Sequence, residues 1–160
     1  MRITIATIGR LKSGSERELA DRYLERFTQL ARGLNFASPR IMEFAESQLR
    51  RADERKLEEE KFLNSSIDEK TFVIALDERG KQLTSSEFAQ LLVKHRDAGR
   101  TDMAVLIGGA DGFAPNIRSR ADLVLSFGAM TMPHQLVRIL MMEQLYRAAT
   151  ILSNHPYHRV

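Results

Sequence analysis

The chain contains no cysteine, and this absence narrows both its chemistry and its compartment. Without cysteine there is no disulfide framework and no thiolate metal site. A chain that does without disulfides suits a reducing compartment. The sequence also has no internal repeat, linker or low-complexity segment. These absences exclude disulfide-rich secreted proteins and repeat proteins.

Long apolar runs are missing as well. The N-terminal residues Met1–Ile8 have no signal-peptide core or cleavage site, and no stretch is long enough to cross a bilayer. We therefore expect neither export nor membrane insertion, and we predict a cytoplasmic protein. With 160 residues, 43% of them hydrophobic and 28% charged, the chain fits a single globular domain over residues 1–160.

Positive and negative charges nearly balance over the chain as a whole, with 24 lysines and arginines against 21 aspartates and glutamates. The net charge is +3 and the isoelectric point is near 9.4, which permits nucleic-acid binding without demanding it. The last quarter of the chain is more one-sided, because residues 128–160 hold three arginines and three histidines against the single acid Glu143. If a polyanion binds, we expect it to bind this quarter.

Apolar runs alternate with helical patterns along the chain. The predicted strands cover residues 2–8, 39–44, 71–77, 103–107 and 122–127. The predicted helices cover residues 15–31, 46–63, 85–98, a short segment after Pro115, and 134–153. Ser15 with Glu18 and Thr84 with Glu87 match the capping box that opens a helix, and residues 78–81 are predicted to turn. This alternation predicts an α/β domain with a mostly parallel sheet and flanking helices.

The predicted helix over residues 134–153 is apolar almost all round. Such a helix must be buried on more than one side. Because a domain of this size rarely offers one helix two apolar partners, we expect a second copy of the chain to cover part of it. The sequence therefore predicts a homodimer.

Three predicted strand ends carry residues suited to a ligand: Leu76, Gly108 and the run Phe127–Met132. In open parallel sheets, ligands bind beyond the carboxyl ends of the strands. Glycine at 108 and 128 would leave bare backbone against which a flat ring or a methionine chain could lie. The simpler alternative, favoured by spacing alone, is that these glycines only form tight turns.

The glycine-rich segment over residues 108–112 matches neither the P-loop nor the Rossmann fingerprint. Both of those patterns serve to hold phosphate groups. The loops therefore suit a cofactor that is recognised by its adenine and apolar parts.

Glu143 and Arg147 lie four residues apart on the same predicted helix, in the order that favours an ion pair. A buried structural pair at a dimer interface and a catalytic role are equally compatible with this spacing. Arg138 is expected to point toward a different partner. His134 follows Pro133 and is most simply a residue of the helix start.

The last residues, Asn154–Arg159, are unusually rich in functional groups for a chain terminus. His155 and His158 can titrate near neutral pH, Tyr157 can stack on a base, and Arg159 can bind a phosphate bidentately. No carboxylate lies close to the two histidines in sequence, so the pattern predicts no metal site.

These motifs together resemble one family closely. The segments Leu106–Gly112, Met132–His134, Glu143–Ala148 and Asn154–Arg159 are similar to those of the RlmH (YbeA) family of SPOUT-class methyltransferases. The resemblance spans the whole length and element order and is most specific from about Thr71 onward. Ala110–Asp111 stands where many relatives have proline and glutamate, and this difference concerns the geometry of the loop.

The resemblance implies an enzyme that methylates N3 of a pseudouridine in 23S ribosomal RNA, within the large subunit or the whole ribosome. It implies S-adenosyl-L-methionine as the cofactor and a deep C-terminal trefoil knot. It also implies a homodimer in which the tail reaches the partner's cofactor pocket. The cofactor would be held by the residues at the strand ends, namely Leu76, Gly108, Phe127, Gly128, Ala129, Met130, Thr131 and Met132.

Methyl transfer to N3 requires that the nitrogen lose its proton and be held in line with the methyl group. His158 is the first candidate for assisting this proton loss and Glu143 the second. Tyr157, which can stack on the base, Arg159, which can bind a phosphate, and Arg147, the partner of Glu143, complete the set of candidate catalytic residues. Loss of the proton to solvent is the alternative. Two other functions also fit the sequence: a SPOUT methyltransferase with a tRNA target, and a ribosome-binding factor that keeps the fold without catalysis.

Overall fold

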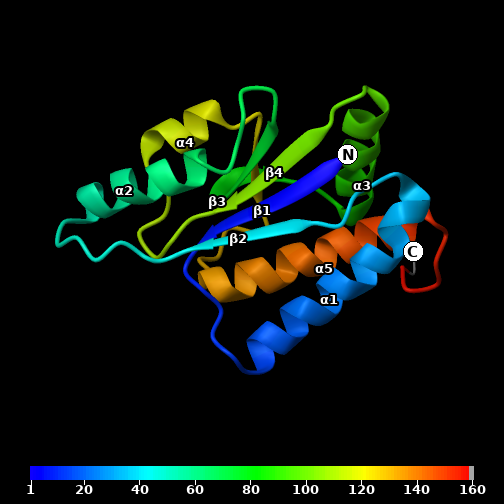
Figure 1. Ribbon diagram of the computed structural model, residues 1–160, viewed down its shortest axis with the longest axis horizontal. Helices are drawn as coiled ribbons and strands as arrows, with labels where there is room; N and C mark the ends of the chain where they lie inside the picture. Colours follow the sequence, from blue (N-terminus) through cyan, green and yellow to red (C-terminus); the bar gives the residue numbers. More distant parts are fainter. Residues whose placement is uncertain (159–160) are drawn as a thin grey trace.

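The computed structural model describes residues 1–158, which form a central sheet between two layers of helices (Figure 1). The strands are β1 (Arg2–Ile8), β2 (Arg40–Phe44), β3 (Phe72–Gln82), β4 (Asp102–Ile107) and β5 (Leu123–Ser126). The helices are α1 (Ser15–Ala31), α2 (Ala52–Asn64), α3 (Ser85–Asp97), α4 (Pro115–Arg120) and α5 (His134–Leu152), with a 3-10 turn, η1 (Arg32–Leu34), after α1.

All pairs of neighbouring strands are parallel, and the strand order is β2-β1-β4-β3-β5. The predicted α/β fold with a parallel sheet is confirmed. Because the strands are parallel, their carboxyl ends lie along the same edge of the sheet. The loops that follow β1, β3, β4 and β5 therefore meet at this edge.

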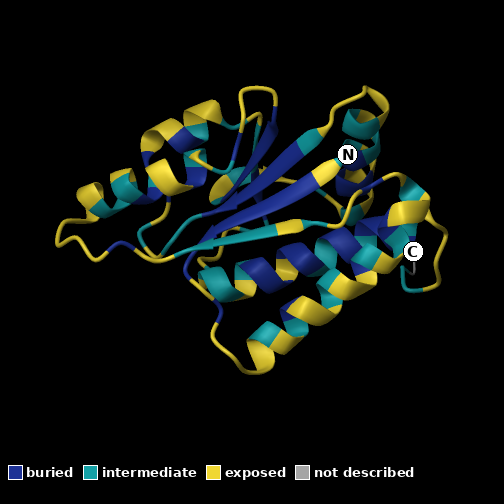
Figure 2. Ribbon diagram, viewed as in Figure 1, coloured by how far each residue is buried: buried dark blue, intermediate teal, exposed yellow. Residues whose placement is uncertain are grey.

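The core has two parts, one on each face of the sheet. Along β1, Ile3 and Ile5 point into the larger part, which α1, α3 and α5 cover. Ala6 and Ile8 point into the smaller part, which α2 and α4 cover. Figure 2 shows β1, β4 and the first part of β3 as the buried centre of the fold, while β2 at the edge of the sheet is only half-buried. Burial on both faces explains why the strands read as continuous apolar runs.

α5 is covered largely by its own chain. It packs against α1, α3 and the sheet, and Met141, Leu145 and Ala148 are fully buried. Contrary to the prediction, α5 does not need a second chain to be buried, because α1 and α3 supply its apolar partners. Two large apolar residues on it remain exposed, Leu136 at 46% and Leu140 at 38%.

Some local predictions differ from the structure. α2 begins at Ala52 and not at residue 46, because the backbone N–H of Ser47 donates to Glu59 Oε1 at 3.1 Å and the preceding loop folds back. The capping box at Ser15 is wrong, since Gly14 occupies the N-cap position and no side chain caps α1. The capping box of Thr84 and Glu87 is confirmed.

The predicted turn over residues 78–81 is an interruption within one long strand. Both Leu76 and Lys81 of β3 pair with Leu125 of β5, and residues 77–80 form a bulge between them. A Cβ on Gly80 would lie 2.7 Å from backbone atoms of Val124 and Leu125. Only glycine lets β3 approach β5 this closely.

The trefoil knot stays a prediction from the resemblance.

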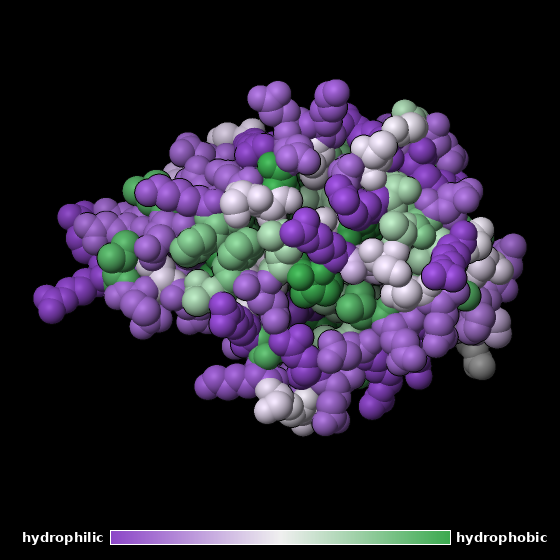
Figure 3. Space-filling view, in the orientation of Figure 1, coloured by the Kyte–Doolittle hydropathy of each residue, from purple (hydrophilic) through white to green (hydrophobic). Residues whose placement is uncertain are grey.

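The surface is mixed in character. Figure 3 shows apolar side chains gathered near the middle of one face, with polar side chains around them. No helix within residues 1–158 is long and apolar enough to cross a membrane.

Candidate functional site

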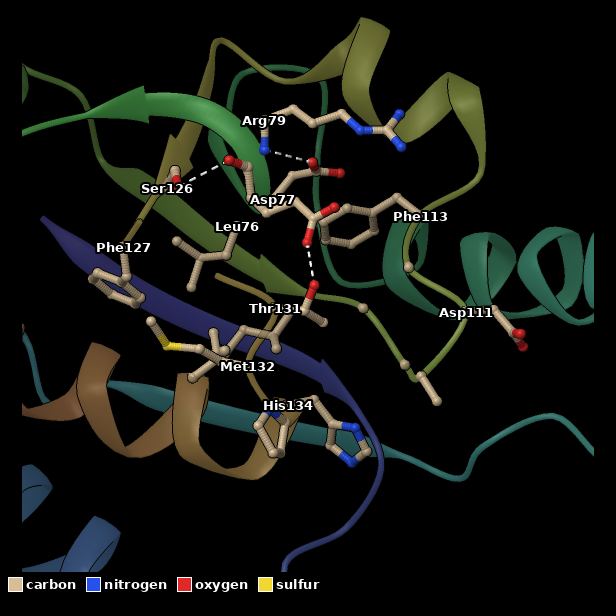
Figure 4. Close-up of a pocket in the computed structure, with 18 of the residues that line it drawn as sticks. Leu76, Asp77, Arg79, Asp111, Phe113, Ser126, Phe127, Thr131, Met132 and His134 are labelled. Carbon is tan, nitrogen blue, oxygen red and sulfur yellow. Dashed lines mark hydrogen bonds between the residues drawn. The ribbon is translucent and has the colours of Figure 1, made fainter. Parts of the chain in front are cut away.

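A cavity of about 860 Å³ opens where the bulge in β3 lies beside the carboxyl ends of β4 and β5 (Figure 4). Its size is typical of pockets that hold a small organic cofactor. Ala129 lies in the loop after β5 but does not line the cavity. The other predicted cofactor residues all line it, namely Leu76, Gly108, Phe127, Gly128, Met130, Thr131 and Met132.

The sheet register explains why these residues meet. Leu76 pairs with Ile107 on one side and with Leu125 on the other. Gly108 follows Ile107 directly, and Phe127 follows two residues after Leu125. The start of the β3 bulge and the carboxyl ends of β4 and β5 therefore lie at the same level, and the segments that follow them surround one space.

The two cavity glycines that were predicted to contact a ligand, Gly108 and Gly128, are explained by the turns that they make. A Cβ on Gly108 would lie 3.3 Å from Gly112 C and from the ring of Phe113, so it would point into its own loop. Gly128 has a φ of 145°, a conformation that side chains disfavour, and nothing lies within 4 Å of its Cβ position. The tight-turn interpretation therefore accounts for both positions.

Polar contacts fix the rim of the cavity. Arg118 Nη1 of α4 donates to Asp77 Oδ2 at 2.9 Å, and the backbone N–H of Arg79 donates to Asp77 Oδ1 at 3.0 Å. Thr131 Oγ1 donates to Glu78 Oε2 at 2.8 Å and joins the loop after β5 to the bulge in β3 (Figure 4). The sequence predicts that a buried strand ends at Asp77, but it gives this acid no role and does not single out Arg118 as its partner.

The first turns of α5 are held by a buried arginine. Arg138 is 1% exposed, and its Nη2 donates to the carbonyl of Gly9 at 2.6 Å and to Thr7 Oγ1 at 2.8 Å. Its Nη1 pairs with Glu43, so the expected separate partner for Arg138 is confirmed. Burial lowers the pKa of Arg138 from its ordinary value, and the charge of Glu43 opposes this shift.

His134 stands beside this cluster and lines the cavity. Figure 4 shows its imidazole turned toward the end of β1. Its Nε2 lies 3.4 Å from Glu46 Oε1, and a Cβ on Gly9 would lie only 2.7 Å from the same nitrogen. His134 is the first residue of α5, as predicted, and it also anchors the cavity loop to the ends of β1 and β2.

The expected ion pair on α5 is confirmed, and the tail folds onto it. Arg147 Nη2 lies 2.6 Å from Glu143 Oε1, and Tyr157 Oη donates to the same oxygen at 3.1 Å. The rings of Tyr157 and Tyr146 are 4.6 Å apart, and the guanidinium of Arg147 lies 4.9 Å from the Tyr157 ring centre. Burial, together with hydrogen bonds to Tyr23 and Glu143, raises the pKa of Tyr157 to about 12.

The remaining tail residues are placed only in part. His158 Nδ1 is buried and has no hydrogen-bond partner within residues 1–158, while His155 is exposed. Arg159, predicted to bind phosphate, lies outside the described residues. Across residues 1–158, no cluster of histidine and carboxylate side chains has an arrangement that would hold a metal ion.

The structure does not bring the two predicted groups of residues together within one chain. None of Glu143, Arg147, Tyr157 and His158 lines the cavity. Glu143 lies nine residues beyond the start of α5, which corresponds to about 13 Å along the helix axis. A site that uses both groups would need either a second chain or a different position of the tail.

Comparison with known proteins identifies the family. A family model described as a predicted SPOUT methyltransferase matches residues 1–158. A protein of Allorhizobium ampelinum named Ribosomal RNA large subunit methyltransferase H is 53% identical, with 99% of both chains covered. A protein of the same name from Rhizobium leguminosarum is 52% identical, with both chains covered completely.

A solved structure shares the fold. It is described as a probable methylase family protein from Haemophilus influenzae and has a TM-score of 0.51 at 13% identity. The alignment covers 99% of this chain and 70% of that one. The match over residues 1–158 and the high identity along the whole length agree with the cavity at the strand ends, and the chain belongs to the SPOUT methyltransferase family.

Proposed function

We propose that this protein uses S-adenosyl-L-methionine to methylate N3 of a pseudouridine in 23S ribosomal RNA, and that it acts on assembled ribosomes in the bacterial cytoplasm. The observation that carries the proposal is the cavity, which seven of the eight predicted cofactor residues line. It occurs in a chain more than 50% identical over its whole length to proteins named as large-subunit ribosomal RNA methyltransferases.

The cavity residues fit this cofactor. Leu76, Phe127 and Met132 offer apolar contact for an adenine ring, and the backbone around Gly108 and Gly128 offers polar groups for its edge. S-adenosyl-L-methionine supplies the methyl group, and its transfer needs neither a metal nor a phosphate loop. The role left to the protein is to hold the donor and to orient the base.

The proposed enzyme is a homodimer. The exposed residues Leu136 and Leu140 and the pair Glu143 and Arg147 recur at helical spacing along one face of α5. A two-fold axis across this stripe would pair it with itself, as in most homodimers. Such pairing would bring the tail region of one chain toward the cavity of its partner.

The tail residues have distinct proposed roles. The hydroxyl of Tyr157 is protonated near neutral pH, as that of any phenol is, and we propose that it serves as a donor while the ring stacks on the base. His158 is the group proposed to assist loss of the N3 proton. Glu143 and Arg147 hold the tail, and Arg159 is proposed to bind an RNA phosphate.

Two other functions make different predictions. A ribosome-binding factor without catalysis would not need a cofactor cavity, so the open cavity favours an enzyme. A tRNA methyltransferase would have the same cavity, but the relatives are named for ribosomal RNA. Mass mapping of ribosomal RNA from cells with and without the gene distinguishes both alternatives from the proposed function.

A mixed dimer tests the shared site. One subunit carries Gly108→Leu, which should displace the Gly112–Phe113 turn, and the other lacks residues 157–160. If the tail acts on the partner, the intact tail of the first subunit serves the intact cavity of the second, and one site is restored. Activity at background, with both parent proteins folded and dimeric, would reject the shared site.

A further inference from the structure

Glu59 is a buried acid on the otherwise solvated helix α2. Its side chain is 5% exposed, and Oε1 accepts the backbone N–H of Ser47 at 3.1 Å. Its Oε2 is buried and has no hydrogen-bond partner among residues 1–158. An unpaired carboxyl oxygen is costly to bury, so its position calls for a role that the cavity and tail do not supply.

The unpaired oxygen faces Gly109. A Cβ at this residue would lie 3.0 Å from Glu59 Oε2, 3.3 Å from Oε1 and 3.0 Å from Ile8 Cγ2. The φ of Gly109 is not in the left-handed region, so the backbone conformation does not require glycine there. The requirement for glycine comes from the space that Glu59 and Ile8 occupy.

Gly109 also lines the cavity, together with the rest of the loop over residues 108–112, whereas Glu59 does not. The loop therefore lies between the carboxyl group and the cavity. Through Ser47, the same carboxyl group is joined to the loop after β2, and Ile8 closes the contact at the end of β1. Glu59 is thus packed where the ends of β1, β2 and β4 meet.

We propose that Glu59 is a positioning residue of the cofactor site, whose carboxyl group fixes the Gly108–Gly112 loop against the ends of β1 and β2. Small movements of a loop that binds a cofactor change affinity strongly, because every contact depends on the same backbone. This inference rests on the proposed function for its ligand, S-adenosyl-L-methionine.

The surroundings of Glu59 favour its neutral form. Burial raises the pKa of Glu59, and the carboxylates of Asp111 and Glu46 raise it further, while the N–H of Ser47 and the charge of Arg55 oppose the shift. Because the pKa of Glu59 is raised in the folded protein, its contribution to the free energy of unfolding is complete below the ordinary pKa of a glutamate. This contribution is lost as the pH rises through the raised pKa of the folded state. The loop should therefore loosen as Glu59 ionises.

The first test compares Glu59→Gln with Glu58→Gln, which alters a neighbouring acid that contacts the Ser47 hydroxyl. Calorimetry would measure the dissociation constant for S-adenosyl-L-methionine from about pH 5 to about pH 9. The unmodified protein should lose affinity relative to Glu59→Gln by up to about tenfold per pH unit above the raised pKa. Glu58→Gln should follow the unmodified protein, and the ligand's own titration cancels in the comparison.

The second test is a double-mutant cycle with Gly109→Ala and Glu59→Ala. Each single change should weaken cofactor binding by about tenfold, the first by crowding the carboxyl group and the second by removing the support. The double variant should lose less affinity for S-adenosyl-L-methionine than the two single losses combined would predict. The methyl group added at Gly109 then occupies the space that the Glu59 side chain has left. Hydrogen exchange at residues 108–112 in the free protein provides a readout that does not depend on the cofactor.

The outcomes separate the two proposals. An unmodified protein that never binds S-adenosyl-L-methionine would overturn the proposed function, while faster loop exchange in Glu59→Ala would still support the positioning role. Identical pH profiles for the unmodified protein and Glu59→Gln, together with unchanged loop exchange in Glu59→Ala, would overturn the positioning role. If Gly109→Ala fails to fold, the pH profile of the isosteric Glu59→Gln still decides.

Discussion

The two ends of α5 are built for different tasks. At its start, three loops leave an open cavity, and buried Arg138 pins the helix to the end of β1. Toward its end, Tyr146, Tyr157 and the pair Glu143 and Arg147 pack into a compact cluster that does not reach the cavity. The chain thus keeps the cavity for the methyl donor apart from the cluster that is proposed to handle the base. If the tail acts on the cavity of a partner chain, as proposed, each subunit of this small enzyme depends on the other for half of its site.

Deleting residues 157–160 should have the largest effect. Methylation should fall by about a thousandfold or more, because the groups that orient the base are removed. The dissociation constant for S-adenosyl-L-methionine should change by less than about threefold, since no tail residue within 1–158 lines the cavity. Single-turnover assays measure methylation, and calorimetry measures cofactor binding. If cofactor binding fell together with methylation, the tail cluster and the cavity would not be independent of each other.

Replacing Arg138 tests the other end of α5, where this arginine joins the helix to the end of β1. Arg138→Met should lower the free energy of unfolding by about 3–5 kcal/mol, because it leaves buried polar partners unsatisfied. Arg17→Met is the matched control, since Arg17 contacts the same Glu43 from a more exposed position, and it should cost about 1 kcal/mol. Urea unfolding checks both values, and equal losses would show that burial of the arginine is unimportant.

The exposed stripe on α5 can be tested without disturbing either end. Leu140→Glu should weaken the proposed dimer by about 2 kcal/mol, or roughly thirtyfold in its dissociation constant. Leu57→Glu is the control, because Leu57 is 51% exposed on α2. Sedimentation of both variants measures the effect, and an unmodified protein that is monomeric at micromolar concentration would refute the dimer.

Replacing Tyr157 should have the smallest effect on stability, and titration of its phenol reports whether the tail lies on α5. Its phenol should titrate near pH 12 while the tail rests on its own α5. Because the folded pKa is raised, the stabilising contribution is complete below about pH 10 and is lost as the pH rises toward the folded value. Tyr157→Phe should cost about 1 kcal/mol through loss of the bond to Glu143. Ultraviolet titration showing an ordinary phenol would place the ring in water.

The sheet was predictable from the sequence because parallel strands that are buried on both faces consist of continuous runs of apolar residues. Helix boundaries and partners depended on distant residues. The late start of α2 follows from a contact between Ser47 and Glu59, and the burial of α5 follows from its packing on α1. Neither contact has a local signature, so periodicity predicted a longer α2 and assigned the partner of α5 to a second chain.

The cavity was predictable in its location because the ends of parallel strands converge. Its supports were not predictable. Arg138 binds the carbonyl of Gly9, which is 129 residues earlier in the chain, and Arg118 binds Asp77 from another helix. An arginine in an apolar helix signals that a partner exists but does not reveal which one. The tail was identified by its composition, whereas its packing on Tyr146 needed the structure.

The close approach of β3 to β5 at Gly80 has a consequence during protein synthesis. β5 is made more than forty residues after the bulge that it must fit against. At roughly 5–20 residues per second, the bulge waits for seconds without its neighbour. The cavity rim therefore cannot form until synthesis is nearly complete. Among the described elements, only α5 follows β5, so the cofactor site should be one of the last parts of the nascent chain to become structured.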